Sequence, residues 1–174
     1  IVDNPAIAAE LDAAFTGMPK PLDVYLDLDC GMHRTGIEAG GKAVDLYRQV
    51  HESKSLQVGG IHAYDGHNHA EDLDKRTEQC EVEFQIVRVL AEELREEGMP
   101  VPEIVAGGSP TFPIHAKHDD VTCSPGTLFF WDYGYGTRFP DMNFLLAALV
   151  ITRVISKPGA NRICVDLGHK AIAA

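Results

Sequence analysis

The sequence lacks the hallmarks of several protein classes. Its 174 residues contain no Cys-x-x-Cys pair, and the four cysteines stand far apart, at positions 30, 80, 123 and 164. Scattered thiols of this kind are typical of a reduced, cytoplasmic protein rather than of a disulfide framework. The longest apolar run, from Phe144 to Ile151, is much shorter than a bilayer span. We therefore expect a cytoplasmic protein without a transmembrane segment.

Positive charge is also scarce. Fifteen Lys and Arg residues stand against 26 Asp and Glu residues, which gives a formal net charge of −11. The field of such a chain repels phosphate, so we expect neither nucleic acid nor a membrane surface as a partner. Any bound phosphate must instead be held by local hydrogen-bond donors. Hydrophobic residues make up 45% of the chain, which is enough for a globular core.

The order of the predicted elements indicates an α/β fold. Up to residue 110, helical patterns over residues 5–16, 40–51 and 72–97 alternate with extended patterns over residues 22–28, 56–63 and 103–106. Such alternation is typical of parallel βα units. After residue 121 we expect a β-rich region, with strands over residues 128–131, 144–156 and 162–167 and a turn over residues 158–161. Three βα units cannot close a barrel, so we interpret the chain as an internal piece of a longer protein.

Polar, glycine-rich segments follow the predicted strands. In parallel α/β folds the functional residues gather at the carboxyl ends of the strands. Gly107-Gly108-Ser109 and Gly126-Thr127 have the composition of a phosphate cradle, because glycine lets backbone N–H groups approach an anion and the hydroxyls add donors. Each segment also fits an ordinary turn. Neither a Walker sequence nor a Gly-x-Ser-x-Gly elbow is present, which argues against a serine hydrolase.

Three other groups leave alternatives open. His62, His67 and His69 could form the metal centre of a metal-dependent hydrolase, or they could be ordinary loop histidines. Cys30 could be a nucleophile, but a core thiol is the simpler interpretation. Arg34 follows a strand and precedes Thr-Gly, which is equally compatible with an exposed loop residue and with a side chain aimed at an anion.

Together these segments resemble the fold-type III pyridoxal phosphate enzymes of the alanine racemase superfamily, and within it the D-threonine aldolase and D-serine dehydratase-like branch. The resemblance rests on five motifs in the order that the family shows them: "LDLDCGMHRTGI", "GGIHAYDGHNH", "VAGGSPTF", "SPGTLFFWDYGYG" and "ICVDLGHKA". They span almost the whole chain.

The resemblance implies the later half of a (β/α)8 TIM barrel over residues 1–120, followed by the start of a β domain over residues 121–174. It implies pyridoxal 5′-phosphate as the cofactor, with Arg34 beside its phenolic oxygen and Tyr64 near its pyridine ring. The phosphate would lie in the loop that contains Gly108, Ser109 and Thr111, helped by Gly126 and Thr127.

Two of the family's features are missing from this sequence. The Schiff-base lysine belongs to an Arg-Pro-His-x-Lys-Thr type of motif, and no lysine here has that context. The ligands of the family's divalent metal (Mn, Mg or Zn), a His-x-Cys or His-x-Asp pair near the C-terminus, are absent as well. We expect both outside this segment, so that the segment alone is inactive.

The implied function is that of a D-amino acid lyase. The best match is a D-threonine aldolase, which yields glycine and acetaldehyde, and the longer protein is expected to be a homodimer. A D-serine dehydratase and an amino-acid racemase remain alternatives within the family. A non-catalytic pyridoxal phosphate carrier shares the barrel but lacks the β domain, so the predicted strands after residue 128 argue against it.

Overall fold

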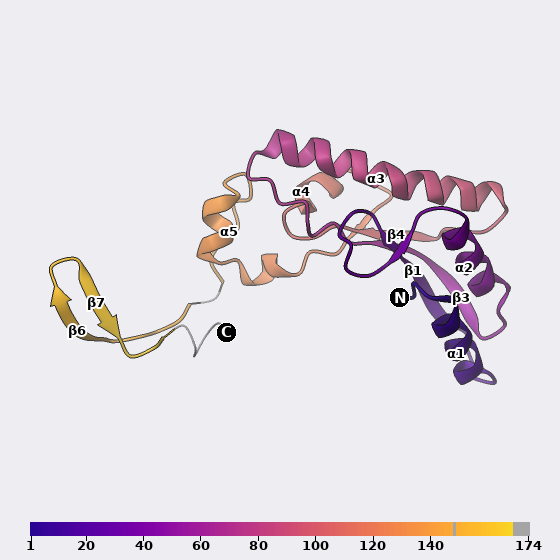
Figure 1. Cartoon of the computed structure of the whole chain (residues 1–174), viewed down its shortest axis with the longest axis horizontal. Helices are drawn as coiled ribbons and strands as arrows, with labels where there is room; N and C mark the ends of the chain where they lie inside the picture. Colours follow the sequence, from indigo (N-terminus) through magenta and orange to yellow (C-terminus); the bar gives the residue numbers. More distant parts are fainter. Residues whose placement is uncertain (148, 169–174) are drawn as a thin grey trace.

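A parallel β-sheet with helices packed on it forms the body of the molecule. The computed structural model describes residues 1–147 and 149–168 (Figure 1). Its helices and strands are, in chain order, α1 (Pro5–Phe15), β1 (Leu22–Asp29), β2 (Ile37–Glu38), α2 (Gly41–Glu52), β3 (Leu56–Ala63), α3 (Leu73–Glu96), β4 (Glu103–Ala106), α4 (Phe112–His115), β5 (Thr122–Cys123), the 3-10 helix η1 (Thr127–Phe130), α5 (Tyr133–Arg138), β6 (Val154–Gly159) and β7 (Arg162–Val165).

The strands of the main sheet follow the order β2-β1-β3-β4-β5, and all their pairings are parallel. Leu28 of β1 pairs with Ala63 of β3, which pairs with Ala106 of β4, which in turn pairs with Cys123 of β5. The carboxyl ends of four strands therefore lie in register at one edge of the sheet. The loops that follow these strands must begin side by side.

The helices bury an apolar face against the sheet. Val44 and Leu46 of α2 and Val87 and Leu90 of α3 belong to the same core cluster as the strand residues. Side-chain caps fix the N-terminal ends of two helices: the side chain of Asn4 accepts a hydrogen bond from the backbone of α1, and Asp72 does so for α3. The alternating α/β pattern expected over the first 110 residues is confirmed.

The region after Cys123 differs from its prediction. Residues 128–131 were expected to form a strand, but they lie in η1 and its C-cap, and α5 follows. The reason is a second, small core, in which the buried side chains of Trp131, Phe139 and Met142 pack together. Leu128 of η1 and Tyr135 of α5 pack against these side chains, so the helical turns contribute residues to this core.

The predicted strand over residues 144–156 begins only at Val154, and residue 148 lies outside the described part. β6 and β7 form an antiparallel hairpin that projects away from the sheet, and all six β6 residues are exposed (Figure 1). The parallel sheet runs on to Cys123, so the division near residue 121 stays a prediction. Residues 169–171, the end of the last motif, lie outside the described residues. No helix among the described residues is long and apolar enough to cross a membrane.

Gly60 of β3 makes the close approach of β3 to β4 possible, and it lies beside an irregularity in the pairing of β1 with β3. The register shifts by one residue there, since Val24 pairs with Val58 but Tyr25 pairs with Gly60. Gly60 has a φ of +144°, and a Cβ atom on it would overlap the carbonyl oxygen of Glu103 in β4. A side chain at this position would thus push β4 away from β3.

We predict that Gly60→Ala lowers the free energy of unfolding by about 3 kcal/mol or more, because it combines backbone strain with a clash against backbone. Urea denaturation measures this change. Gly41→Ala is the matched control, since a Cβ atom at Gly41 meets nothing within 4 Å. Equal stability of the two variants would contradict the tight β3–β4 approach.

Candidate functional site

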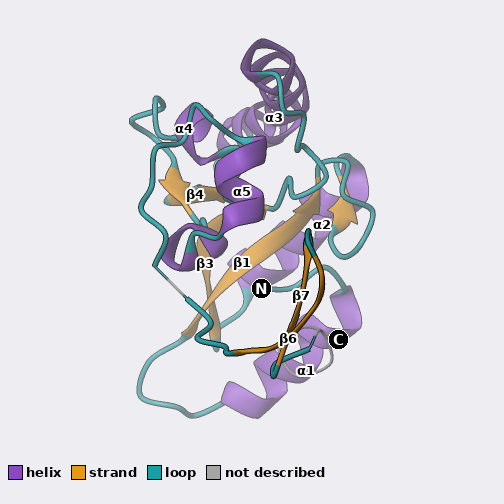
Figure 2. Cartoon of the chain, turned by 90° about the vertical axis from the view of Figure 1, so that its left-hand side faces the viewer, coloured by secondary structure: helices purple, strands orange, loops and turns teal. Residues whose placement is uncertain are grey.

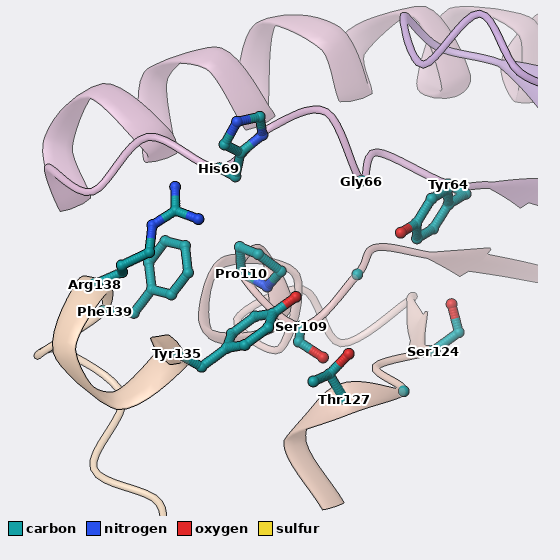
Figure 3. Close-up of a pocket in the computed structure, with 12 residues that line it drawn as sticks. Tyr64, Gly66, His69, Ser109, Pro110, Ser124, Thr127, Tyr135, Arg138 and Phe139 are labelled. Carbon is teal, nitrogen blue, oxygen red and sulfur yellow. The ribbon is translucent and has the colours of Figure 1, made fainter. Parts of the chain in front are cut away.

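A cavity of about 370 Å³ opens at the carboxyl edge of the sheet. Its wall comes from the loops after β3, β4 and β5 and from α5 (Figures 1 and 3). Figure 2 shows α5 and α4 at the same end of the molecule as the end of β4. The residues that line the cavity are Tyr64, Gly66, His69, Gly108, Ser109, Pro110, Ser124, Gly126, Thr127, Tyr135, Arg138 and Phe139.

Five of the seven residues predicted to hold a cofactor lie in this wall, namely Tyr64, Gly108, Ser109, Gly126 and Thr127. They come from three loops that are far apart in the sequence, and the register of the parallel strands brings them together. Arg34 and Thr111, the other two, do not line the cavity. Each of them contacts a residue that does.

The hydroxyl group of Ser109 is poised to donate into the cavity. Ser109 is buried, and its Oγ accepts a hydrogen bond from the backbone N–H of Leu128 at 3.2 Å. Its hydroxyl hydrogen is therefore left for another acceptor. In Figure 3 the oxygens of Ser109 and Thr127 project toward each other. The two hydroxyls form a pair of donors for an anion at this wall.

The ring of Tyr64 forms another part of the wall, and two glycines make room for it. A Cβ atom on Gly66 would overlap the Tyr64 hydroxyl, and one on Gly108 would lie 3.2 Å from the ring. Arg34 stacks on this ring, with its guanidinium carbon 4.6 Å from the ring centroid. Such a contact is a favourable cation–π interaction. Arg34 thus supports the wall of the cavity through Tyr64.

Thr111 lies beneath the cavity rather than in its wall. Its hydroxyl donates to Oδ1 of Asp65 at 2.7 Å, and its Oγ1 accepts from the backbone N–H of Gly108 at 3.0 Å. Asp65 also contacts Nε2 of His115 at 2.8 Å. Burial alone would raise the pKa of Asp65, but the hydrogen bonds from His115 and Thr111 outweigh it and hold the pKa below its usual value. Asp65 is therefore a buried carboxylate.

The three histidines of the hypothetical metal centre do not converge. Nδ1 of His62 lies 2.7 Å from Asp27, Nε2 of His67 lies 2.8 Å from Glu83, and His69 lines the cavity. Among the described residues, the one group with metal-ligand spacing is Asp65, Cys80 and His115. The structure thus gives no support to a hydrolase built on the three histidines.

Cys30 and Cys80 are buried thiols. Burial, with Asp65 nearby, raises the pKa of Cys30 to about 12 and also raises the pKa of Cys80. Both groups are protonated at neutral pH, and a protonated thiol is a poor nucleophile. The interpretation of Cys30 as a core residue fits this environment.

Four polar residues of the wall were not among the predicted cofactor-binding residues. His69, Ser124, Tyr135 and Arg138 add polar groups to it. Arg138 is paired with Glu71 at 3.0 Å, so its charge is shared between this ion pair and the cavity. Arg138 could have been found from the sequence, because it is a basic residue in an acidic chain and closely follows the motif "SPGTLFFWDYGYG". No lysine is among the lining residues of this cavity in the described part of the chain.

The sequence of the chain is similar to those of known proteins. The family model described as alanine racemase, N-terminal domain, matches residues 1–133. A D-threonine aldolase from Arthrobacter sp is 27% identical over 99% of this chain and 47% of its own length. A 3-hydroxy-D-aspartate aldolase from Paracoccus denitrificans (strain Pd 1222) is 26% identical over 98% of this chain and 46% of its own length.

A solved structure, that of D-threonine aldolase from Filomicrobium marinum, superimposes with a TM-score of 0.89 at 27% identity. The match covers 97% of this chain and 46% of that chain. The chain thus spans about half the length of the curated relatives it matches. The parallel sheet described above corresponds to part of an alanine racemase-type barrel.

We predict that iodoacetamide at neutral pH modifies Cys164 well before Cys30 and Cys80, because Cys164 is exposed and the other two are buried thiols with raised pKa values. Mass spectrometry of peptides after a timed reaction measures the order. The same reaction in urea serves as a control, in which all cysteines should react. Rapid modification of Cys30 in the native chain would contradict the buried environment described here.

Proposed function

The chain belongs to the alanine racemase N-terminal domain family, and from this membership we propose that it is part of a pyridoxal phosphate-dependent lyase for β-hydroxy-D-amino acids. The reaction proposed is the cleavage of D-threonine into glycine and acetaldehyde. The observation that carries the proposal is the cavity at the carboxyl edge of the sheet, where three loops converge with donors for an anion. The relatives named D-threonine aldolase and 3-hydroxy-D-aspartate aldolase support the substrate class.

The residues of the cavity fit the phosphate of this cofactor. A phosphate needs donors rather than a large opposing charge when it binds at a loop rich in glycine and hydroxyl groups. Ser109 offers a hydroxyl whose oxygen is already occupied by Leu128, and Thr127 lies opposite it. We propose that these two residues and the backbone near Gly108 and Gly126 hold the phosphate. Local donors of this kind would hold the phosphate although the net charge of −11 repels it.

The remaining contacts belong to the ring of the cofactor. Tyr64 is held in place by the stacked guanidinium of Arg34 and by close packing against Gly66 and Gly108. We propose that this fixed ring packs beside the pyridine ring and excludes water from it. Arg34 would add a positive charge near the phenolic oxygen of the cofactor. When bound, pyridoxal phosphate supplies an electron sink for the charge that develops on the α-carbon of the substrate.

Other parts of the proposal concern the longer protein. The lysine that anchors the cofactor and the ligands of a divalent metal (Mn, Mg or Zn) are proposed to lie outside this chain, so that the chain alone does not turn over substrate. Residues 1–120 are proposed to be part of the barrel, and residues 121–174 to begin a β domain. We also propose a cytoplasmic homodimer, and the four free cysteines support a reducing compartment.

We predict that Ser109→Ala weakens the binding of pyridoxal 5′-phosphate by about tenfold, because one hydrogen bond to a charged group is lost. Fluorescence titration of the cofactor measures the dissociation constant. Ser156→Ala, in the exposed strand β6, is the matched control and should bind as tightly as the parent chain. Unchanged affinity in Ser109→Ala would show that the phosphate does not lie at this wall.

We predict that the longer protein carrying this chain converts D-threonine into glycine and acetaldehyde in equal amounts. Acetaldehyde is measured with alcohol dehydrogenase, and glycine by amino-acid analysis. A 2-oxo acid with ammonia would identify a dehydratase instead, and L-allothreonine alone, the product of inversion at the α-carbon only, would identify a racemase. Either result would contradict the aldolase. The 174-residue chain alone should yield none of these products.

A further inference from the structure

The carboxylate of Asp65 lies beneath the loop of residues 107–111, in which Ser109 lines the cavity. Asp65 follows Tyr64 directly, just beyond the end of β3, whereas the loop follows β4. Asp65, Thr111 and His115 are among the buried polar residues, and Asp65 is 4% exposed. A carboxylate buried this deeply is costly unless its oxygens are satisfied by donors. The hydrogen-bond donors around this carboxylate indicate its role.

Four groups surround the two oxygens of Asp65. Oδ1 accepts from the backbone N–H of Gly108 at 3.0 Å and from the hydroxyl of Thr111 at 2.7 Å. Oδ2 lies 2.8 Å from Nε2 of His115 and 3.7 Å from the thiol of Cys80. An ionised carboxylate has about four acceptor sites and no donor, so this set of partners matches it fully. An amide at this position would place an N–H group against donors.

These bonds fix both ends of the loop. Gly108 lies at its start, and Thr111, which also accepts from the N–H of Gly108, lies at its end. Between them stands Ser109, whose hydroxyl faces the cavity (Figure 3). Gly107, with a φ of +87°, approaches the network so closely that a Cβ atom on it would lie 2.6 Å from the His115 ring. The loop is thus bound to one carboxylate on the neighbouring strand's loop.

We infer that Asp65 is a positioning residue for the anion-binding loop: with Thr111 and His115 it holds the loop of residues 107–111 so that Ser109 points at the phosphate. Asp65 itself does not touch the ligand, because it lies behind the wall. His115 offsets the cost of a carboxylate beneath an anion site by donating from Nε2. This inference rests on the proposed function, since it takes the ligand of the loop to be the phosphate of pyridoxal phosphate.

The test compares pyridoxal 5′-phosphate with pyridoxal, which lacks the phosphate, in the parent chain and two variants. Asp65→Asn replaces one acceptor oxygen by an amide, and Thr111→Val removes the hydroxyl while keeping the shape. Each variant should lose about tenfold in affinity for pyridoxal 5′-phosphate and little for pyridoxal. A change in the ratio of the two affinities is a result that general loss of structure would not produce.

Asp27→Asn is the matched control. Asp27 is 5% exposed and pairs with His62 at 2.7 Å, so this variant also disturbs a buried Asp–His pair, but away from the cavity. Its ratio of affinities should equal that of the parent chain. Melting temperatures identify any variant that fails to fold, and Thr111→Val, which keeps the charge of Asp65, then decides the question.

Hydrogen exchange supplies a readout that needs no ligand. The N–H of Gly108 should exchange at least tenfold faster in Asp65→Asn than in the parent chain, because its acceptor is weakened. An unchanged affinity ratio in folded variants would overturn the positioning role. A parent chain that binds pyridoxal as tightly as pyridoxal 5′-phosphate would instead contradict the proposed cofactor, and the exchange rate of Gly108 would then decide alone whether Asp65 holds the loop.

Discussion

The wall of the cavity depends on the hydrogen bonds that the buried carboxylate of Asp65 accepts. It joins the loop after β3 to the loop after β4 through the backbone of Gly108 and the hydroxyl of Thr111. The parallel register makes this possible, because Ala63 and Ala106 pair directly at the ends of the two strands. The backbone of Gly107 continues the ladder by donating to the carbonyl of Ala63 at 3.1 Å. Two loops thereby behave as one rigid wall.

An anion site in a chain of net charge −11 requires hydrogen-bond donors that the fold holds in place. Long-range attraction is not available, so affinity must come from donors that are already oriented before the ligand arrives. The hydroxyl of Ser109 is oriented by Leu128, and its loop is held by Asp65. The ring of Tyr64 is fixed by the stacked guanidinium of Arg34 and by close packing against Gly66 and Gly108. Each element of the wall is held by a group that does not itself line the cavity.

Much of the α/β half of the fold could be predicted from the sequence, because its signals are local. Asn4 and Asp72 mark helix starts, and apolar periodicity marks α2 and α3. The motifs also located five residues of the wall, since a strand end in a parallel sheet predicts where a loop begins. Glycine and hydroxyl composition then indicates what such a loop can bind.

The remainder depends on contacts that no local pattern contains. The helical turns at η1 and α5 pack Leu128 and Tyr135 against the small core of Trp131, Phe139 and Met142, although the apolar sequence there favours a strand. The support of the loop by Asp65 and His115 joins residues fifty positions apart. The histidines near Asp65 suggested a metal, but His62 pairs with Asp27, His67 pairs with Glu83, and His69 lines the cavity. Composition indicated the glycine and hydroxyl residues of the wall, and the family resemblance added Tyr64, but neither indicated that Asp65 holds the loop.

The central claim is that the phosphate of pyridoxal 5′-phosphate is bound by the wall that Ser109 and Thr127 form. A crystal structure of the protein carrying this chain, grown with the cofactor, tests it most directly. We predict phosphate density within hydrogen-bond distance of the Ser109 hydroxyl, with the loop of residues 107–111 still bonded to Asp65. Phosphate density outside this cavity, or a loop that has left Asp65 to bind the phosphate, would contradict this binding site.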